Sequence, residues 1–405
     1  MLFRSPVAGS DAIKVVLVGC GGRGTGAAVQ ALKADPGVII WAMADAFADR
    51  IEAAHAELVK GSLAERVQVP PERRFAGMDG AAKACASGAH VAILAGPPGF
   101  RPDHLNTAVS AGLHVFCEKP MFVDAAGARR VVDAVKAARA RNVNLVSGFC
   151  WRRAPAERET FRRIADGQIG QVLAMHSDYL TTPLGTQPRK PEWGDMEFQI
   201  RNWQHMVWLS GDFIVEQAVH SIDKINWAFG NEPPIRCTGI GGRAVRENVP
   251  ERGDVYDHFS VVYEWPDDRR ATLVWRQYPD SFNENVDTIL GTKGRAFLNG
   301  WGPVHRLSGA VNWTYPKDGP KANMYQVEHD ELFRAIRAGQ RIDDGDWMVQ
   351  SCRLALMGRM ASYTGQAVTW KEVIESKEDL MPPVLAMDAA PPVPSVRQPG
   401  KTKLV

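Results

Sequence analysis

Three side chains have the types and spacing of a proton-transfer site. Glu216 and His220 are four residues apart in the predicted helical segment "EQAVH", so they share one helix face. An imidazole can take the proton of a substrate hydroxyl, and a neighbouring carboxylate can orient it. Lys119, in "EKP", offers an ammonium that can polarise the same oxygen. We predict that all three are catalytic, with His220 as the base and Glu216 as the alternative base.

Two other interpretations of this pair stay open. Glu216 and His220 could be a surface pair of little consequence. Together with Asp223, one turn later, they could instead bind a metal, because carboxylate and imidazole are ordinary metal ligands. Asp223 could equally be a second group that orients His220. We predict no metal, because Lys119 already supplies the positive charge that a metal would bring.

A dinucleotide cradle is predicted near the start of the chain. "VGCGGRG" contains Gly19-x-Gly21-x-x-Gly24, directly after the apolar run 14–19 and at the start of a helix. In this context the glycines allow a tight turn and close approach of a pyrophosphate, which the free N–H groups of the helix start attract. The next strand ends at Asp45, 21 residues after Gly24. A carboxylate there binds a ribose 2′-hydroxyl and repels a 2′-phosphate, which favours NAD over NADP.

Further cofactor candidates follow from the same sheet edge, since open α/β sheets bind ligands at the carboxyl ends of their strands. One apolar run ends in "AGPPGFRPDH" and the next in Glu118-Lys119-Pro120. Glu118 would hold the nicotinamide ribose or tune the amine, and Pro120 is a candidate for a cis bond. The predicted cofactor residues are Gly19, Gly21, Gly22, Arg23, Gly24, Asp45, Gly96, Pro97, Pro98, His104, Glu118, Lys119, Trp151 and Arg152.

An aromatic segment before the second site is predicted to contact the substrate. Between Trp193 and Trp208, several rings alternate with polar residues. Aromatic rings that alternate with polar residues can line a ligand pocket, whereas core packing is the common fate of a single Trp. The predicted substrate residues are Lys119, Trp193, Arg201, Trp203, Trp208, Glu216 and His220, with Tyr179, Tyr256, His258 and Arg276 as weaker candidates.

Two folding units are needed to bring these residues together. Up to residue 150, short apolar runs alternate with Ala-rich helical stretches, which predicts an α/β Rossmann unit, residues 1–150, with a doubly wound parallel sheet. Longer alternating strands then predict an α+β unit, residues 151–380, with a large open, mainly antiparallel sheet. Residues 381–405 are rich in Pro, and we expect an arm that is ordered only if it lies on a neighbouring surface.

The composition restricts the partners and the compartment. Lys and Arg number 48 against 46 Asp and Glu, a formal net charge of +2, so no nucleic-acid partner is expected. Six cysteines without a C-x-x-C pair argue against a disulfide framework and favour the cytoplasm. No apolar run is long enough to cross a membrane. Loss of an export leader would place the chain in the periplasm instead.

The quoted motifs together resemble one known family. The glycine loop, "AGPP...H", "AGLHVFCEKP" and "GDFIVEQAVHSID" are similar to the Gfo/Idh/MocA family of NAD(P)-dependent oxidoreductases over nearly the whole chain. The resemblance implies sugar or cyclitol substrates, an active-site role for Lys119 and a homo-oligomer, dimer or tetramer, formed through the C-terminal sheet. The family's usual Asp-x-x-x-His reads Glu216-x-x-x-His220 here, so the carboxylate is longer by one methylene.

We therefore predict an NAD-dependent oxidoreductase that moves hydride between a secondary hydroxyl of a sugar, glycoside or cyclitol and nicotinamide. One alternative is a glycosidase or epimerase that keeps NAD tightly bound and works through a transient keto-sugar. Another is a non-catalytic NAD-binding protein on the same fold.

Overall fold

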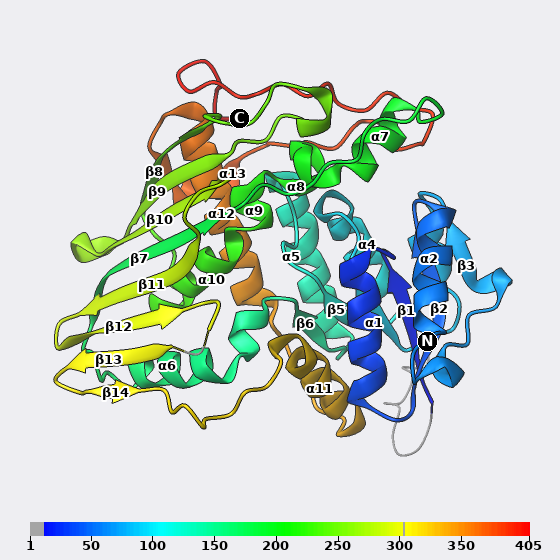
Figure 1. Cartoon of the computed structure of the whole chain (residues 1–405), viewed down its shortest axis with the longest axis horizontal. Helices are drawn as coiled ribbons and strands as arrows, with labels where there is room; N and C mark the ends of the chain where they lie inside the picture. The colour runs from blue at the N-terminus through cyan, green and yellow to red at the C-terminus, as the bar shows by residue number, and fades with distance from the viewer. Residues whose placement is uncertain (1–11, 303) are drawn as a thin grey trace.

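The computed structural model describes residues 12–302 and 304–405, so the first eleven residues of the predicted Rossmann unit lie outside the description. In those ranges the strands form two sheets, one of six strands and one of nine (Figure 1). A parallel Rossmann sheet combined with a second, mainly antiparallel sheet is the fold class that the sequence predicted, and it is confirmed.

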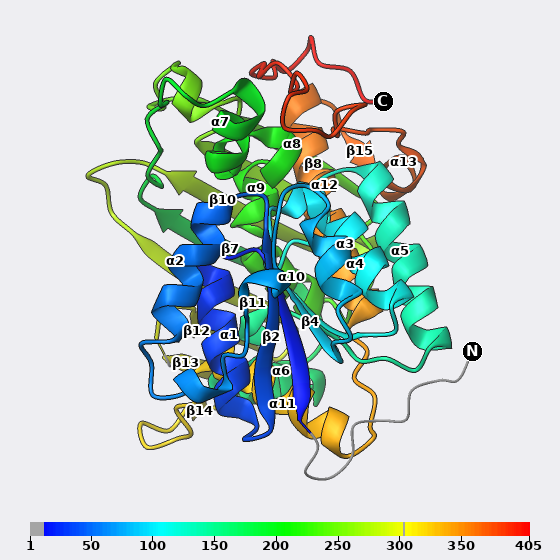
Figure 2. The same cartoon turned by 90° about the vertical axis from the view of Figure 1, so that its right-hand side faces the viewer.

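The six-stranded sheet is parallel throughout, in the order β3-β2-β1-β4-β5-β6. Its strands are β1 (Ile13–Val18), β2 (Val38–Asp45), β3 (Arg74–Ala76), β4 (Val91–Leu94), β5 (His114–Cys117) and β6 (Leu145–Ser147). Its helices are α1 (Gly22–Ala34), α2 (Ala48–Leu58), α3 (Gly80–Cys85), α4 (Arg101–Ser110) and α5 (Ala125–Ala140). The strands are apolar along most of their length because helices cover both faces, α1 and α2 on one side and α3, α4 and α5 on the other (Figure 2).

A helix from the second half of the chain completes one face of this sheet. α11 (Met324–Arg337) packs beside α1 and puts Leu332 and Phe333 into the same buried cluster as Val15 and Leu17 of β1. The two halves of the chain are therefore joined through a shared apolar core as well as through a polypeptide link.

The nine-stranded sheet has the order β14-β13-β12-β11-β7-β10-β9-β8-β15 and is antiparallel except for β7 beside β10. Its strands are β7 (Val172–Thr181), β8 (Arg236–Gly242), β9 (His258–Glu264), β10 (Arg270–Gln277), β11 (Glu284–Gly291), β12 (Gly294–Asn299), β13 (His305–Gly309), β14 (Trp313–Thr314) and β15 (Val368–Thr369). The helices around it are α6 (Pro155–Ala165), α7 (Asp195–Arg201), α8 (Val207–Ser210), α9 (Phe213–Glu216), α10 (Val219–Ala228), α12 (Gly345–Thr364) and α13 (Trp370–Glu375). None of the helices in the described part of the chain has both the length and the apolarity needed to cross a membrane.

The two faces of this sheet differ. α10 and α12 pack on one face and lie between it and the Rossmann sheet (Figure 1). The opposite face carries exposed apolar side chains, among them Leu173, Ile240 and Leu290. The side chains of the helix-covered face point toward the interior of the molecule, where the second half of a site can meet the first.

The Pro-rich arm, residues 381–405, lies on its own chain, where it passes over α7 and α8 (Figure 1). The Gln199 side-chain amide donates to the Pro392 carbonyl at 3.0 Å, and the Tyr256 hydroxyl donates to the Arg397 carbonyl at 2.7 Å. The surface that orders the arm is thus supplied by the second half of the same chain.

Candidate active site

The glycine loop is closely packed on one side and open on the other. Gly19 has φ +94°, and a Cβ there would come within 2.3 Å of the Gly96 nitrogen, while a Cβ on Gly24 would come within 1.9 Å of the Gly19 carbonyl. At Gly21 and Gly22, by contrast, a Cβ would meet no heavy atom within 4 Å. Only glycine fits the packed positions, and the open positions leave the N–H groups at the start of α1 free to bind a phosphate.

A cavity of about 570 Å³ lies against this loop. Asp45, at the end of β2, accepts hydrogen bonds from the Cys20 and Phe47 N–H groups at 2.7 and 3.1 Å, and burial raises the pKa of its carboxyl. Arg50 lines the same end of the cavity. The predicted cofactor residues on the cavity wall are Gly19, Gly21, Gly22, Arg23, Gly24, Asp45, Gly96, Pro97 and His104. A glycine cradle at a helix start with a carboxylate at the next strand end fits a dinucleotide.

The opposite wall of the cavity comes from the aromatic segment. The Arg201 guanidinium pairs with Asp49 at 3.0 Å and lies 4.0 Å from the centre of the Phe47 ring, so it ties α7 to the first turn of α2. Trp203 lines the cavity beside it. Arg201 and Trp203, predicted to contact substrate, therefore lie on the wall that faces the Asp45 end of the cavity.

The two outer tryptophans of this segment are buried. Trp193 is 8% exposed and lies against Arg201, and Trp208 is 4% exposed. Trp208 packs edge-on against Phe100 at 5.9 Å between ring centres and donates its indole N–H to Gln199 at 2.7 Å. These contacts are those of core packing, the alternative that the sequence left open for these rings.

Lys119 meets the second half of the molecule. The Lys119–Pro120 bond is cis. The Lys119 ammonium donates to the main-chain carbonyl of Glu216 at 2.5 Å and to its carboxylate at 3.3 Å, and both side chains are largely buried, 15% and 11% exposed. The ammonium that follows β5 and the carboxylate that ends α9 are thus in direct contact.

His220 lies four residues further on, between two aromatic rings. It belongs to α10, whereas Glu216 ends α9, so the two residues are not on one helix as the sequence predicted. Trp151 is 5.0 Å and Phe149 6.2 Å from it, measured between ring centres. Its pKa is held well below the usual value by burial, and then by the positive charges of Lys119 and Lys224. Its Nδ1 is buried without a hydrogen-bond partner in residues 12–302 and 304–405. A neutral imidazole of this kind is ready to accept a proton.

Glu118 contacts the glycine loop. Its carboxylate is 3.1 Å from the Arg23 Nε, and the side chain of Glu118 is 5% exposed. The Arg23 guanidinium also lies 4.9 Å from the centre of the Tyr325 ring, at the start of α11. Sequence reasoning missed Tyr325, because it enters the site from a helix remote from the motifs and carries no motif of its own.

Arg101, which sequence reasoning also missed, joins two loops of the site. It is 3% exposed and donates to the carbonyl oxygens of Pro120 and Gly96. The first of these carbonyls follows Lys119 and the second lies on the cavity wall. Partners that are main-chain carbonyls give no local signal in a sequence.

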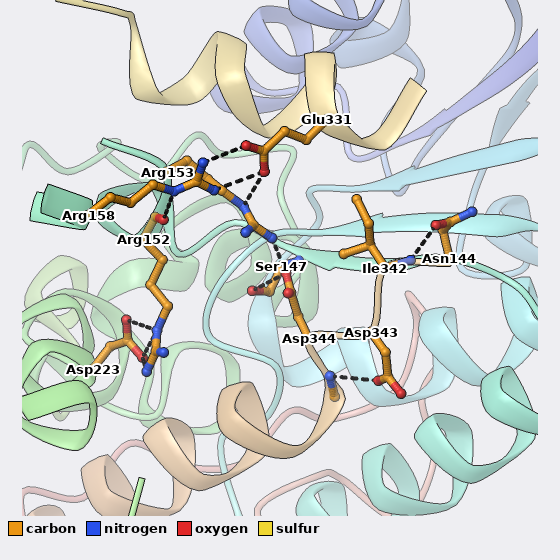
Figure 3. Close-up of polar contacts among 11 residues, drawn as sticks. Asn144, Ser147, Arg152, Arg153, Arg158, Asp223, Glu331, Ile342, Asp343 and Asp344 are labelled. Atoms are coloured by element: carbon orange, nitrogen blue, oxygen red, sulfur yellow. Dashed lines mark hydrogen bonds and ion pairs between the residues drawn. The ribbon is translucent and has the colours of Figure 1, made fainter. Parts of the chain in front are cut away.

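Arg152 does not line the cavity, and the same is true of the other predicted cofactor residues Pro98, Glu118, Lys119 and Trp151. The Arg152 guanidinium is bonded to the Asp223 carboxylate at 2.8 to 3.0 Å, and Figure 3 shows this pair beside a second group of arginines that bind Glu331 and Asp344. Asp223 is therefore engaged by Arg152 and is not a group that orients His220. The alternative metal site loses its third ligand for the same reason.

Both halves of the chain match known family models. Residues 13–145 match the model described as oxidoreductase family, NAD-binding Rossmann fold, and residues 158–297 match the GFO/IDH/MocA C-terminal domain. Together the two matches cover the glycine loop, Lys119, Glu216 and His220.

Individual relatives are distant. The chain is 28% identical over 204 residues to 2,7-anhydro-N-acetylneuraminate hydratase from Escherichia coli (strain K12), which covers 50% of the chain and 49% of that relative. It is 27% identical over 276 residues to 1,5-anhydro-D-fructose reductase from Ensifer adhaerens, which covers 64% of the chain and 73% of that relative. The chain thus spans about half the length of the first relative and more of the second.

The fold extends to solved structures. A levoglucosan dehydrogenase in complex with NADH and levoglucosan superposes with a TM-score of 0.71 at 16% identity, covering 89% of this chain and 99% of that one. At this identity the likeness concerns the fold.

Proposed function

Because the chain belongs to the Gfo/Idh/MocA family of oxidoreductases, we propose that it moves hydride between a secondary hydroxyl of a sugar, glycoside or cyclitol and NAD. The observation that carries the proposal is the contact of Lys119 with Glu216, the last residue of α9, four residues before His220 in α10. We infer that the ammonium, the carboxylate and the neutral imidazole act on one substrate oxygen. Arg101 joins Pro120, next to Lys119, to Gly96 on the wall of the cavity that fits a dinucleotide.

The roles of the side chains follow from their charges. A bound nicotinamide supplies or accepts the hydride at its C4 atom. His220 takes the hydroxyl proton at Nε2, since its low pKa keeps it neutral. Lys119 donates to the same oxygen and stabilises the negative charge that develops on it. Glu216 holds the ammonium in place through both its carbonyl and its carboxylate.

The preference for NAD over NADP belongs to the same proposal. Asp45 supports it, because a carboxylate at the end of β2 accepts from a ribose hydroxyl and repels a 2′-phosphate. Arg50 on the same wall works in the opposite direction. Gly21, Gly22 and Arg23 would hold the pyrophosphate.

The test is a panel of aldoses, disaccharides and cyclitols incubated with NAD, with NADH absorbance as the readout. Lys119→Met and His220→Ala are each expected to lower kcat by 100-fold or more. Lys136→Met and His176→Ala are the matched controls, because both side chains are exposed and remote from the site. NAD binding with no turnover by the unaltered protein would instead favour a non-catalytic NAD-binding protein.

A second candidate function is redox-neutral. The cavity is walled on one side by α7 and by Leu385 of the arm, which favours a retained cofactor, and one relative is named a hydratase rather than a dehydrogenase. In this case NAD would co-purify with the protein. Substrate would be cleaved or epimerised without accumulation of NADH. Measuring released aglycone and NADH in one reaction separates this function from net oxidation.

Assembly and location complete the proposal. Copies would associate as a dimer or tetramer through the exposed apolar face that contains Leu173, Ile240 and Leu290, which light scattering would measure.

The six cysteines are all free and buried, which supports a reducing compartment such as the cytoplasm. Cell fractionation would test this location.

A further inference from the structure

A row of aromatic rings runs from His220 to the solvent. The Trp151 ring centre is 5.0 Å from His220, Tyr179 follows at 6.3 Å from Trp151, and Trp301 follows at 6.2 Å from Tyr179. Exposure rises along the row: Trp151 is 6% exposed, and Trp301 is 52% exposed. The row therefore starts at the proposed base and ends in a half-exposed indole.

The loop that carries Trp301 is fastened to the same site. The Trp151 indole N–H donates to the Gly300 carbonyl at 3.2 Å, and the Gly300 N–H donates to the Asn285 carbonyl at 2.8 Å. The Trp301 N–H donates to the Asn299 side chain at 2.9 Å. The loop of Trp301 is thus fastened to Trp151, the ring that flanks His220, and to the strands β11 and β12 through Asn285 and Asn299.

Gly300 explains how closely this loop can lie. A Cβ at this position would come within 2.2 Å of the Asn285 side-chain oxygen and 3.2 Å of the Trp151 ring. Any other residue would push the loop, and with it Trp301, away from Trp151. A close approach of this kind is a common reason for glycine outside a tight turn.

Tyr179 belongs to the helix-covered face of the sheet. Along β7 it follows Met175 and Ser177, which are buried, at every second residue, so its side chain points to the same side as theirs. The charge of Glu216 is among the causes that raise the pKa of the Tyr179 hydroxyl. Tyr179 therefore lies between the proposed catalytic groups and Trp301.

An aromatic row of this form suits a sugar ring. The C–H face of a pyranose covers an indole or phenol ring, and the ring hydroxyls stay in water at the rim. Single exposed aromatic residues are common and need no explanation. Trp301 differs because it is joined to His220 through two intervening rings and a fixed loop.

We propose that Tyr179 and Trp301 form a second sugar subsite, which binds the ring next to the one whose hydroxyl lies at His220. This inference rests on the proposed function and narrows its substrate to a glycoside of at least two rings. A free monosaccharide or cyclitol would occupy the His220 site alone and leave Trp301 uncovered.

The test compares matched substrates. The rate with glucose is compared with the rates with maltose and cellobiose, and the rate with galactose with that with lactose. Each rate is measured as NADH formation and as reduction of a soluble dye, which also reports oxidation when NAD stays bound. The unaltered protein is expected to favour a disaccharide by about tenfold in kcat/KM. Trp301→Ala should abolish this preference by raising the KM for the disaccharide. The kcat/KM for the monosaccharide should stay within twofold of that of the unaltered protein. Phe282 is an exposed aromatic residue on another loop, and Phe282→Ala should leave both the preference and the kcat/KM for the monosaccharide unchanged. Trp301→Phe should keep much of the preference.

Direct binding separates the subsite from the chemistry. Calorimetry with maltose, cellobiose and lactose is done on the NADH-loaded unaltered protein and on Trp301→Ala. Disaccharide binding that needs Trp301, with no hydride transfer, would refute the proposed function and keep the subsite. Equal kcat/KM for both substrate classes, unchanged in Trp301→Ala, would refute the subsite and keep the function. A change of oligomeric state without a change of preference would assign Trp301 to a contact between copies and refute the subsite.

Discussion

The Asp45 end of the cavity and the His220 site differ in what closes them. At the Asp45 end, Arg201 reaches across to Asp49, and Leu385 of the C-terminal arm lines the wall. At the other site the aromatic row ends in Trp301, which is half exposed. Segments of the second half of the chain thus cover part of the dinucleotide cavity, whereas the aromatic row ends in solvent. We therefore expect the cofactor to exchange more slowly than the substrate.

Among the changes that compare the two ends, the largest effect should come from Arg101, the residue that they share. Arg101 bonds to Gly96 on the cavity wall and to Pro120 beside Lys119. Arg101→Met would leave two buried carbonyls without a donor, and small displacements of reacting groups can cost about 100-fold in rate. We expect kcat to fall by about that factor and the affinity for NAD to fall as well, measured by steady-state kinetics and calorimetry.

Arg101→Lys is the control, because it keeps the charge and one donor while losing the fork that reaches both carbonyls. Its kcat and its affinity for NAD should lie between those of the unaltered protein and those of Arg101→Met. A thermal melt of each variant separates a loss of folding from a loss of geometry. If Arg101→Met folds and lowers only kcat or only the affinity for NAD, Arg101 does not couple the two ends.

The next effect isolates the cofactor end. Arg201→Met removes the bond to Asp49 and the cation over Phe47. We expect the NAD dissociation rate to rise by about tenfold, which corresponds to ~1.4 kcal/mol, measured by stopped-flow fluorescence of bound NADH. The kcat at saturating NAD should stay within twofold. Arg236→Met is the control, because it removes an ion pair of β8 at the surface. An equal rise in the dissociation rate from this variant would contradict the proposed closure.

The two ends also differ in how far a sequence can predict them. The glycine loop and Asp45 are positioned by strand, turn and helix within a short stretch of chain, so spacing alone puts them on one cavity. Lys119 follows from the same logic, because it ends a neighbouring parallel strand. The sequence predicts Glu216 and His220 on one face of one helix, but Glu216 ends α9 and His220 lies in α10, so helix periodicity does not account for their placement.

The remaining contacts depend on partners that are distant along the chain. Trp208 packs on Phe100, Arg152 pairs with Asp223, and Tyr325 reaches Arg23 from α11. Tertiary packing selects these partners, and residue type at one position does not indicate them. The fold shows the same limit: the major strands follow from hydrophobic pattern, but the three-residue strand β3 and the parallel pairing of β7 with β10 do not.

A smaller effect concerns which dinucleotide binds at the Asp45 end. Asp45→Asn removes the negative charge and keeps one acceptor oxygen, so one of the N–H groups of Cys20 and Phe47 loses its acceptor. We expect the ratio of the NADP and NAD dissociation constants to fall several-fold, because Arg50 then faces a 2′-phosphate without opposition. Asp103→Asn is the control, since Asp103 lines the same cavity. An equal change from it would mean that only the overall charge of the cavity matters.

The smallest effect concerns the pH dependence at the His220 site. Since burial and the charges of Lys119 and Lys224 lower the pKa of His220, the acid limb of kcat/KM should lie below the usual histidine value of about 6.5. Lys224 is fully buried and donates to Asp287, so Lys224→Met is combined with Asp287→Asn to leave no unpaired buried charge. The charge of Lys224 is among the causes that lower the pKa of His220, and the charge of Asp287 is not. Removing the pair should therefore raise the pKa of His220 and move the acid limb to higher pH, by less than one unit. Profiles of kcat/KM against pH for the two proteins measure this, and a limb that stays in place or moves to lower pH would mean that His220 is not the group whose protonation stops the reaction.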